Sequence, residues 1–387
     1  MRKTKIRMGM VGGGQGAFIG GVHRIAAAID GQIELVCGAF SSDPQCSRTS
    51  GEDLFLAENR VYGTYEEMIL KEKALPKDKR MELVSIVTPN HVHFGPAKMA
   101  LENGFHVICD KPLSFSLEEA LELEALVAKT GLIFALTHNY TGYPLVKHGR
   151  EMIRNGELGK VRKVVVEYPQ GWLSTRVETE VKYNQKQAEW RTDPKRSGIA
   201  GSVGDIGTHA ENLAEYFTGL KITELCADVS TFVEGRLLDD DANILLHFDN
   251  GAKGVLHCSQ ISAGEENNLS IRVYGEKAGL EWRQMEPNTL LVKHFDKPME
   301  VLRTGYPGLS EAAKAHTRTP AGHPEGYLEA FANIYLDVAH CIQARKAGKT
   351  ADAIYTDYPT VGDGVRGMVF IGKVIESGQA GAVWVKI

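Results

Sequence analysis

The stretch that decides the fold is GMVGGGQGAFIGGVHR, residues 9–24, which contains seven glycines. An apolar run at 6–11 precedes it, an alanine-rich helical run at 22–29 follows, and a second apolar run comes at 33–40. Glycines between a first strand and a first helix allow a tight turn and a close backbone approach to a pyrophosphate, which the helix N-terminus attracts. The stretch therefore predicts a dinucleotide-binding loop rather than a flexible surface loop.

The glycine spacing departs from the usual G-x-G-x-x-G/A pattern, because the third position after Gly12 and Gly14 falls on Ala17. We expect a three-residue insertion after Gly14 and a helix that begins near Ile19 or Gly20. In this arrangement Gly20 takes the third role and permits close helix–strand packing. A helix already under way directly after Gly14 would contradict this interpretation.

The first third of the chain alternates between strand and helix patterns. Continuous apolar strands that alternate with helices are typical of a doubly wound parallel sheet. The sequence therefore predicts an α/β protein with a Rossmann-type domain over residues 1–140. Further strands are expected at 83–87, 106–109 and 132–136, and helices at 51–59, 65–73, 92–103 and 116–129, where Ser116 and Glu119 have capping-box spacing.

The pattern changes after residue 140, where short strands come in hairpin style. We expect a second α/β domain over 141–387 with an open, mainly antiparallel sheet, whose C-terminal helices, about 327–378, pack back on the first domain. The strands are expected at 161–168, 225–233, 242–248, 252–261, 269–274 and 280–285, and the helices at 144–155, from about 206 to 217, at 327–346 and at 361–376.

The composition of the chain further limits the class of protein. A chain of 387 residues with 43% hydrophobic residues and a net charge of −5 indicates an ordinary globular protein of two domains. The lack of a basic excess argues against nucleic-acid binding, and no apolar run is long enough for a membrane span. Six cysteines without C-x-x-C spacing indicate buried thiols, so a cytoplasmic enzyme is expected.

Five segments in this order carry a family resemblance: SIVTPNHVHF (85–94), FHVICDKPLSFSLEEA (105–120), ALTHNYTGYP (135–144), IRNGELGKVRKV (153–164) and WRTDPKRSGIAGSVGDIGTHAENLAEYFTG (190–219). Together they resemble the glucose–fructose oxidoreductase / inositol dehydrogenase / MocA (Gfo/Idh/MocA) family of NAD(P)-dependent oxidoreductases. The resemblance implies hydride transfer with sugars or polyols, no catalytic metal, and a homo-oligomer (dimer or tetramer) formed through the open sheet. The family's glutamate before the lysine is Asp110 here.

Three residues are candidates for catalysis. Lys111 follows an apolar strand, where open α/β sheets bind ligands, and burial beside a cationic nicotinamide would lower its pKa. Asp205 and His209 share a face if a helix begins there. Removal of a hydride from a carbon that bears a hydroxyl also requires a base, and histidine suits that role near neutral pH. An N-cap aspartate and a structural histidine remain the alternatives. By resemblance His209 is the base, Asp205 orients it or binds substrate, and Lys111 assists, although His209 and Lys111 could exchange roles.

The residues expected at the cofactor lie in the glycine loop or after a strand end. Asp43 follows the second strand, where an acidic residue binds the ribose hydroxyls of NAD. No arginine or lysine lies beside the neighbouring serines, which favours NAD over NADP. The full set is Gly12, Gly14, Gln15, Phe18, Ile19, Ser41, Ser42, Asp43, Thr88, Pro89, Asn90, His93, Asp110, Lys111 and Asn139.

The residues expected at the substrate combine aromatic faces, which suit the C–H faces of sugars, with amides and charged groups. Arg191 or Arg318 would clamp the substrate if it were acidic, and Lys182 lies in the loop before Arg191. Three histidines, His23, His91 and His93, lack a carboxylate set, so no metal is expected. The substrate set is Lys111, Tyr140, Tyr168, Gln170, Trp172, Arg191, Asp205, His209 and His323.

These features favour an NAD(P)-dependent dehydrogenase that acts on a secondary hydroxyl of a cyclic sugar, glycoside or inositol-like polyol. One alternative enzyme keeps NAD bound and recycles it, in glycoside hydrolysis or in hydride transfer between sugars. The other alternative is a non-catalytic NAD-binding sensor. The sequence leaves the substrate and the oxidised carbon open.

Overall fold

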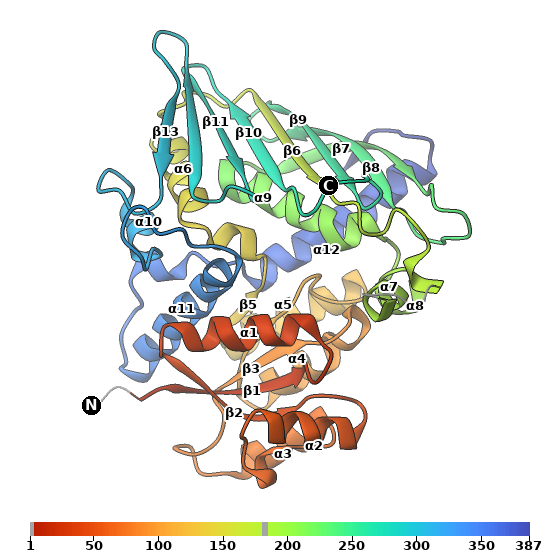
Figure 1. Cartoon of the computed structure of the whole chain (residues 1–387), viewed down its shortest axis with the longest axis vertical. Helices are drawn as coiled ribbons and strands as arrows, with labels where there is room; N and C mark the ends of the chain where they lie inside the picture. Colours follow the sequence, from red (N-terminus) through yellow and green to blue (C-terminus); the bar gives the residue numbers. More distant parts are fainter. Residues whose placement is uncertain (1–3, 180–184) are drawn as a thin grey trace. The chain divides into compact units, whose positions relative to one another are not determined.

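The computed structural model describes residues 4–179 and 185–387 (Figure 1). The chain forms two compact units. The first consists of residues 1–139 and 327–365, and the second of residues 140–326 and 366–387. No helix within the described ranges is long and apolar enough to cross a membrane.

The first unit contains a five-stranded sheet in the order β2-β1-β3-β4-β5. All neighbouring strands run parallel, and β3 is buried along its whole length. The predicted doubly wound parallel sheet is therefore confirmed. Its strands are β1 (Ile6–Gly12), β2 (Ile33–Ala39), β3 (Leu83–Val87), β4 (His106–Cys109) and β5 (Phe134–Leu136).

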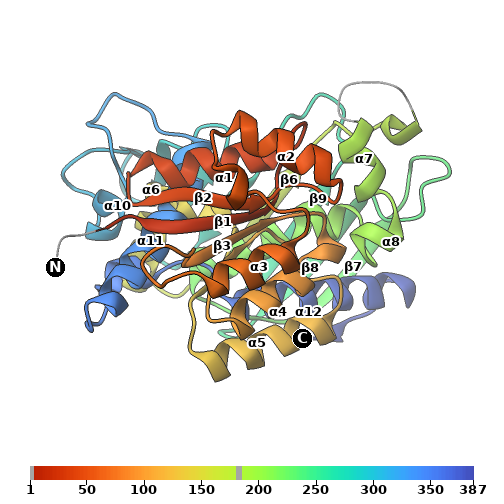
Figure 2. The ribbon, with the colours of Figure 1, turned by 90° about the horizontal axis from the view of Figure 1, so that it is seen from below.

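Helices cover both faces of this sheet, as continuous apolar strands require. One face packs in a core with α1 and α11, in which Met8 and Met10 meet Val22 and Phe331. On the other face α3, α4 and α5 lie side by side (Figure 2). The helices of this unit are α1 (Phe18–Ile29), α2 (Pro44–Asp53), α3 (Tyr65–Ala74), α4 (Phe94–Glu102), α5 (Leu117–Thr130) and α11 (Tyr327–Lys346).

Helix ends follow local capping chemistry. Ser116 caps α5 as predicted, since its side chain accepts a hydrogen bond from the Glu119 N–H. The helix predicted at 51–59 is wrong: α2 begins at Pro44, because Asp43 accepts hydrogen bonds from two N–H groups of the first turn and Pro44 occupies the first helical position.

The second unit contains a nine-stranded sheet in the order β13-β12-β11-β10-β6-β9-β8-β7-β14. Its neighbouring strands are antiparallel except β6 and β9, which confirms the mainly antiparallel prediction. The strands are β6 (Lys163–Pro169), β7 (Ile222–Ser230), β8 (Asp241–Phe248), β9 (Lys253–Ser259), β10 (Ser270–Tyr274), β11 (Ala278–Arg283), β12 (Thr289–His294), β13 (Glu300–Arg303) and β14 (Val385–Lys386). The last three were not predicted.

Helices pack on one face of the second sheet, and side chains alternate between that face and the outside. In β6, Val164 and Val166 are buried toward α9, whereas Val165 faces outward and is half-buried. The remaining helices are α6 (Pro144–Arg154), α7 (Gln185–Arg191), α8 (Pro194–Ser197), α9 (Thr208–Thr218), α10 (Glu311–Ala315) and α12 (Val361–Gln379), whose residues from 366 onward belong to this unit.

Candidate active site

The carboxyl ends of the parallel strands in the first unit carry most of the predicted cofactor residues. The glycine loop follows β1, Thr88 follows β3, Asp110 and Lys111 follow β4, and Asn139 follows β5. The connections leave β1 and β3 in opposite directions, toward β2 and toward β4, so the loops after these two strands diverge. This is the topological switch point at which open α/β sheets bind ligands.

The glycine loop has the geometry of a phosphate cradle. Gly12 and Gly13 have φ angles of +80° and +73°, a backbone conformation that favours glycine. A Cβ atom on Gly20 would lie 2.3 Å from the carbonyl oxygen of Gly13, so helix and loop touch through bare backbone. The lengthened loop is confirmed, with the helix beginning at Phe18 and Gly20 in the close-packing role. Gly13 was not among the predicted residues.

Unfilled hydrogen-bonding capacity at the strand ends suits a dinucleotide. The start of α1 has no side-chain cap, since Ala17 stands at the N-cap, which leaves its N–H groups for an anion. Among the residues that the structure describes, the buried Thr88 Oγ1 and Asn139 Nδ2 have no hydrogen-bond partner. These residues fit a bound NAD.

Several predicted cofactor residues also make hydrogen bonds within the protein. The Asp43 carboxylate accepts hydrogen bonds from the Gln45 and Cys46 N–H groups at 2.8 and 3.2 Å, so it caps α2. Gln15 donates from its main chain to Ser50 and from its side chain to Asp53. Phe18 and Ser42 are exposed, and Ile19 and Ser41 are half-buried.

His93 braces the loops rather than presenting a free ring nitrogen. Its Nδ1 lies 2.7 Å from Pro112 O and its Nε2 lies 2.8 Å from Thr88 O. Burial lowers the pKa of the ring below its ordinary value, although the nearby Asp110 opposes the shift. His93 therefore ties the turn after β3 to the turn after β4, next to the buried Asn90 and the half-buried Pro89.

His23, Tyr335 and Ser85 form a buried hydrogen-bonded cluster next to Asp110. His23 Nδ1 lies 2.8 Å from the Tyr335 hydroxyl, which lies 2.9 Å from Ser85 Oγ. The opposite ring nitrogen, Nε2, is 4.0 Å from an Asp110 carboxylate oxygen, to which Thr137 donates a hydrogen bond. Burial lowers the pKa of His23 to about 4, so the ring is neutral at physiological pH.

This histidine makes the free energy of unfolding depend on pH. The pKa of His23 is about 4 in the folded chain and 6.5 when exposed, so the unfolded chain binds more protons between these values. Stability should therefore decrease as pH falls from 6.5 toward 4, by about 1.4 kcal/mol per pH unit for each such group. His106 and His138, also with pKa values of about 4, should add to the slope.

We expect His23→Gln to make the free energy of unfolding less dependent on pH, by about 1.4 kcal/mol per pH unit, which is the contribution of one proton. Urea unfolding between pH 6 and pH 4.5 measures this slope. His257→Gln, on the outward face of β9, is the control and should leave the slope unchanged. An unaltered slope in His23→Gln would mean that His23 is protonated in the folded chain.

In the second unit, Asp205 and His209 lie on one continuous helical segment. Asp205 belongs to a π-helical turn, Val203–Gly207, and His209 to the first turn of α9. The Asp205 carboxylate accepts hydrogen bonds from Arg191 Nε at 3.0 Å and from Gln260 Nε2 at 2.9 Å. Gln260 was not predicted. A π-helical turn within an α-helix is frequent at functional sites.

Asp239 fixes the start of this helical segment and was also missed. Its buried carboxylate accepts hydrogen bonds from the Gly201 and Val203 N–H groups at 2.6 and 2.8 Å, and from the Ser202 hydroxyl at 2.7 Å. Desolvation raises the pKa of Asp239, while these hydrogen bonds oppose the shift. The run of three aspartates at 239–241 was the available signal.

The predicted substrate residues Tyr140, Tyr168 and Gln170 come together with His209. The His209 ring meets the Tyr140 ring edge-on, with centroids 4.8 Å apart, and the Tyr168 ring at 6.3 Å. The two tyrosine hydroxyls are hydrogen-bonded to each other, and burial raises the pKa of Tyr140. Asn267, which was not predicted, bonds to Tyr140, Tyr168 and Gln170.

Other predicted substrate residues have different surroundings. Trp172 donates its indole N–H to Gln170, and its ring lies near the Arg191 guanidinium. His323 is exposed in a turn, with its Nδ1 3.3 Å from Pro320 O, which assigns it to that turn rather than to the cluster around His209. Arg318 is paired with Glu325 at 3.5 Å. Lys182 lies outside the described residues.

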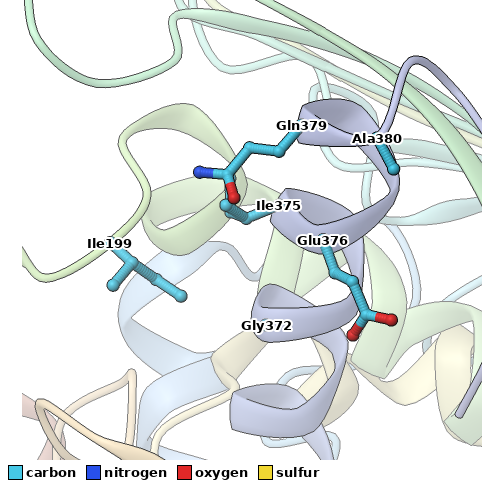
Figure 3. A pocket seen from close by; sticks show the side chains of 6 residues that line it. All are labelled: Ile199, Gly372, Ile375, Glu376, Gln379 and Ala380. Carbon is cyan, nitrogen blue, oxygen red and sulfur yellow. The ribbon is translucent and has the colours of Figure 1, made fainter.

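The second unit also has a groove of about 700 Å³ (Figure 3). Ile199 faces the side of α12 that bears Ile375 and Gln379, while Glu376 points away. Its remaining lining residues are Gly372 and Ala380. Glu376 is paired with Lys373 at 2.8 Å, and the lining contains none of the predicted site residues.

The parallel sheet, its glycine cradle and the partnerless atoms at its strand ends define an NAD-binding oxidoreductase, and family models agree. The model for the oxidoreductase family with an NAD-binding Rossmann fold matches residues 6–138, and the GFO/IDH/MocA C-terminal domain model matches residues 146–281. The chain belongs to the Gfo/Idh/MocA family.

Relatives cover nearly the whole chain. The uncharacterized oxidoreductase YfiI of Bacillus subtilis (strain 168) is 36% identical over 384 residues, which are 98% of this chain and 96% of the relative. The crystal structure of an oxidoreductase from Sinorhizobium meliloti is 47% identical, with a TM-score of 0.89 over 99% of this chain and 100% of that one. An inositol dehydrogenase homolog from Azotobacter vinelandii, complexed with NADH and myo-inositol, is 35% identical, with a TM-score of 0.91 over 99% and 98% of the two chains.

Proposed function

We propose that this protein oxidises a secondary hydroxyl of a neutral cyclic polyol or sugar, with NAD as the hydride acceptor. The observation that carries the proposal is the cluster of His209, Tyr140, Tyr168 and Asn267, which combines a histidine with hydroxyl and amide groups. Such groups suit a ligand with many hydroxyls. The complex of the Azotobacter vinelandii homolog with myo-inositol supports this substrate class.

The charges in the second unit favour a neutral substrate over an acidic one. Arg191, a candidate clamp for an acid, is paired with Asp205, and Arg318 is paired with Glu325. Each guanidinium charge is thereby balanced by a carboxylate. An anionic ligand would have to displace these partners or remain unpaired, which is costly in a buried site.

The chemistry divides among the chain's own residues. NAD, when bound, supplies the carbon that accepts the hydride. In our proposal His209 accepts the proton that leaves the substrate hydroxyl, and Asp205, held by Arg191 and Gln260, binds a neighbouring substrate hydroxyl or stabilises the charged imidazole. Lys111, at the end of β4, positions the substrate oxygen and assists the proton transfer. Its role rests on its place in the fold and on the family resemblance.

A screen of inositols, pyranoses and glycosides with NAD and with NADP, read at the nicotinamide absorbance, tests the function. Steady formation of free NADH with one neutral polyol would support it. Activity only when two sugars are supplied, or only hydrolysis of a glycoside, would indicate the alternative with recycled NAD. Binding of NAD without turnover of any of these compounds would favour a sensor.

We also propose that the outward face of the second sheet binds a second copy of the chain. Strand register places one row of side chains across the face, with aliphatic residues at both ends and the charged Arg272 and Glu281 between them. Leu245 at one end is 49% exposed. Aliphatic side chains at both ends of such a row suit a symmetric interface. The row consists of Leu245, Val255, Val165, Arg272, Glu281, Leu291 and Val301.

Leu245→Asp should convert the oligomer into a smaller species, because a charge would be buried without a partner in the interface. Light scattering after size exclusion gives the mass. Leu121→Asp, at a 48% exposed position on α5 of the first unit, is a matched control that should keep the wild-type mass. A monomeric wild type, or an unchanged mass in Leu245→Asp, would contradict the proposal.

A further inference from the structure

Arg24, on the first helix of the dinucleotide domain, carries a charge that no carboxylate of the described chain balances. Its side chain is half-buried, and it forms no ion pair within residues 4–179 and 185–387. Its guanidinium contacts only neutral atoms there, since Nη1 donates to the Gly13 carbonyl oxygen at 2.6 Å and lies 3.5 Å from Met10 Sδ. A charge that is partly removed from water normally has a partner of opposite sign. Arg24 therefore lacks a counter-charge in the protein itself.

The carbonyl group that Arg24 contacts belongs to the phosphate cradle. Gly13 follows β1 with a φ of +73°, and its carbonyl oxygen would lie 2.3 Å from a Cβ atom on Gly20. Arg24 comes four residues after Gly20 in α1, so the two residues share one face of the helix. A carbonyl oxygen has a partial negative charge that opposes a nearby anion. The guanidinium offsets this charge and holds the Gly13 peptide in place.

The charge of Arg24 acts on its surroundings, where water screens it weakly. Burial is the main cause that lowers the pKa of the neighbouring His23, and the charge of Arg24 lowers it further, while Asp110 opposes the shift. Burial also lowers the pKa of Arg24, so its environment disfavours the charged form. The uncapped N-terminus of α1, at Ala17, adds partial positive charge to the same loop. An anion at this loop would offset both charges.

We propose that Arg24 provides the positive charge of the dinucleotide site and that the pyrophosphate of NAD balances it. Arg24 acts through the Gly13 peptide and through its charge, and is thus a positioning residue. Because the charge is unbalanced in the free protein, binding of an anion removes an electrostatic cost, which strengthens the binding. The inference concerns the cofactor alone and does not depend on the proposed substrate.

The test compares ligands with and without a pyrophosphate. Arg24→Met keeps a long side chain but removes the charge and the N–H groups. We expect the dissociation constants for NAD and for ADP-ribose to rise about tenfold at about 0.05 M KCl, where charges are little screened. The dissociation constant for adenosine, which has no phosphate, should change by less than about twofold. Isothermal titration calorimetry measures all three.

Two further variants separate charge from shape and from net charge. Arg24→Lys restores the charge, so its NAD affinity should lie within about threefold of the wild-type value. Arg80→Met is the matched control, because Arg80 precedes β3 and therefore lies toward the amino edge of the sheet, opposite the glycine loop. It should leave the NAD affinity unchanged. At about 0.5 M KCl the difference between Arg24→Met and the wild type should become smaller.

Each of three results would contradict the proposal. The first is an unchanged NAD affinity in Arg24→Met, and the second is an equal loss in Arg24→Lys, which would assign the effect to the shape of arginine. The third is an equal loss of adenosine binding, which would show that the substitution disturbs the whole site. If Arg24→Met does not fold, as judged by thermal unfolding, the neutral and more polar Arg24→Gln takes its place with the same expected results.

Discussion

His209→Ala should lower kcat by about 10²–10⁴-fold, because a positioned base contributes that much when a proton must leave with the hydride. The His209 ring is buried against Tyr140 and Tyr168, so alanine also leaves a space that water could enter. Stopped-flow and steady-state NADH formation with the best polyol from the screen would measure the loss. NAD affinity should stay unchanged, since the glycine loop belongs to the first unit.

The control for this prediction is His257→Ala. His257 lies on the outward face of β9 and contacts Asn243, and its loss should leave kcat unchanged. Lys111→Ala should also lower kcat, and the pair of single variants shows which residue is the base. A proton-transfer defect in His209→Ala should be reduced at high pH, where hydroxide competes as the base. Wild-type turnover in both His209→Ala and Lys111→Ala would refute the catalytic assignment.

Gly20→Ala should weaken NAD binding by about 30-fold or more, through backbone displacement that also costs about 1–3 kcal/mol of stability. The added Cβ would lie 2.3 Å from Gly13 O and 2.4 Å from Gly13 Cα, and backbone at this distance must move. Gly13 has φ of +73° and shapes the turn in front of α1, so its displacement changes the phosphate cradle. Titration of intrinsic fluorescence with NAD gives the affinity.

Gly21→Ala is a closely matched control, because it makes the same chemical change one residue later in the same helix. Its Cβ would come no closer than 4.0 Å to a neighbouring heavy atom, the Arg24 Nη2. Alanine is favoured over glycine inside a helix by about 1 kcal/mol, so this variant should be at least as stable as the wild type. Equal NAD affinities in the two variants would mean that the contact between Gly20 and Gly13 does not shape the site.

Patterns with a local physical cause were predicted well from the sequence. The parallel sheet followed from continuous apolar strands, and the lengthened loop followed from the distance between Gly14 and Gly20. The end of β4 placed Lys111 correctly at the carboxyl edge of the sheet. Asp43 was assigned to the ribose from its position after β2, but the Asp-Pro pair is also a strong helix start, and the structure gives its carboxylate that role.

Residues that act through long-range contacts were not predictable in this way. Asn267 lies in a polar loop that resembles any other, and its importance arises because the loop returns to Tyr140, 127 positions earlier in the chain. Gln260, directly after β9, and Asp239, shortly before β8, similarly reach the segment of Asp205 from distant parts of the sequence. His93 was predicted to contact the cofactor, but only the folded chain shows two carbonyls at its ring nitrogens.

The first unit is assembled from two separate segments of the chain, residues 1–139 and 327–365, and the ribosome makes these segments at different times. Helix α11 completes the core on one face of the parallel sheet, through residues such as Phe331 and Tyr335. The ribosome releases α11 only after residues 140–326 of the second unit have been made. Until then Met8 and Met10 stay exposed on that face of the sheet. The nascent chain is therefore expected to need protection from aggregation during this interval, and a fragment ending at residue 139 should not fold alone.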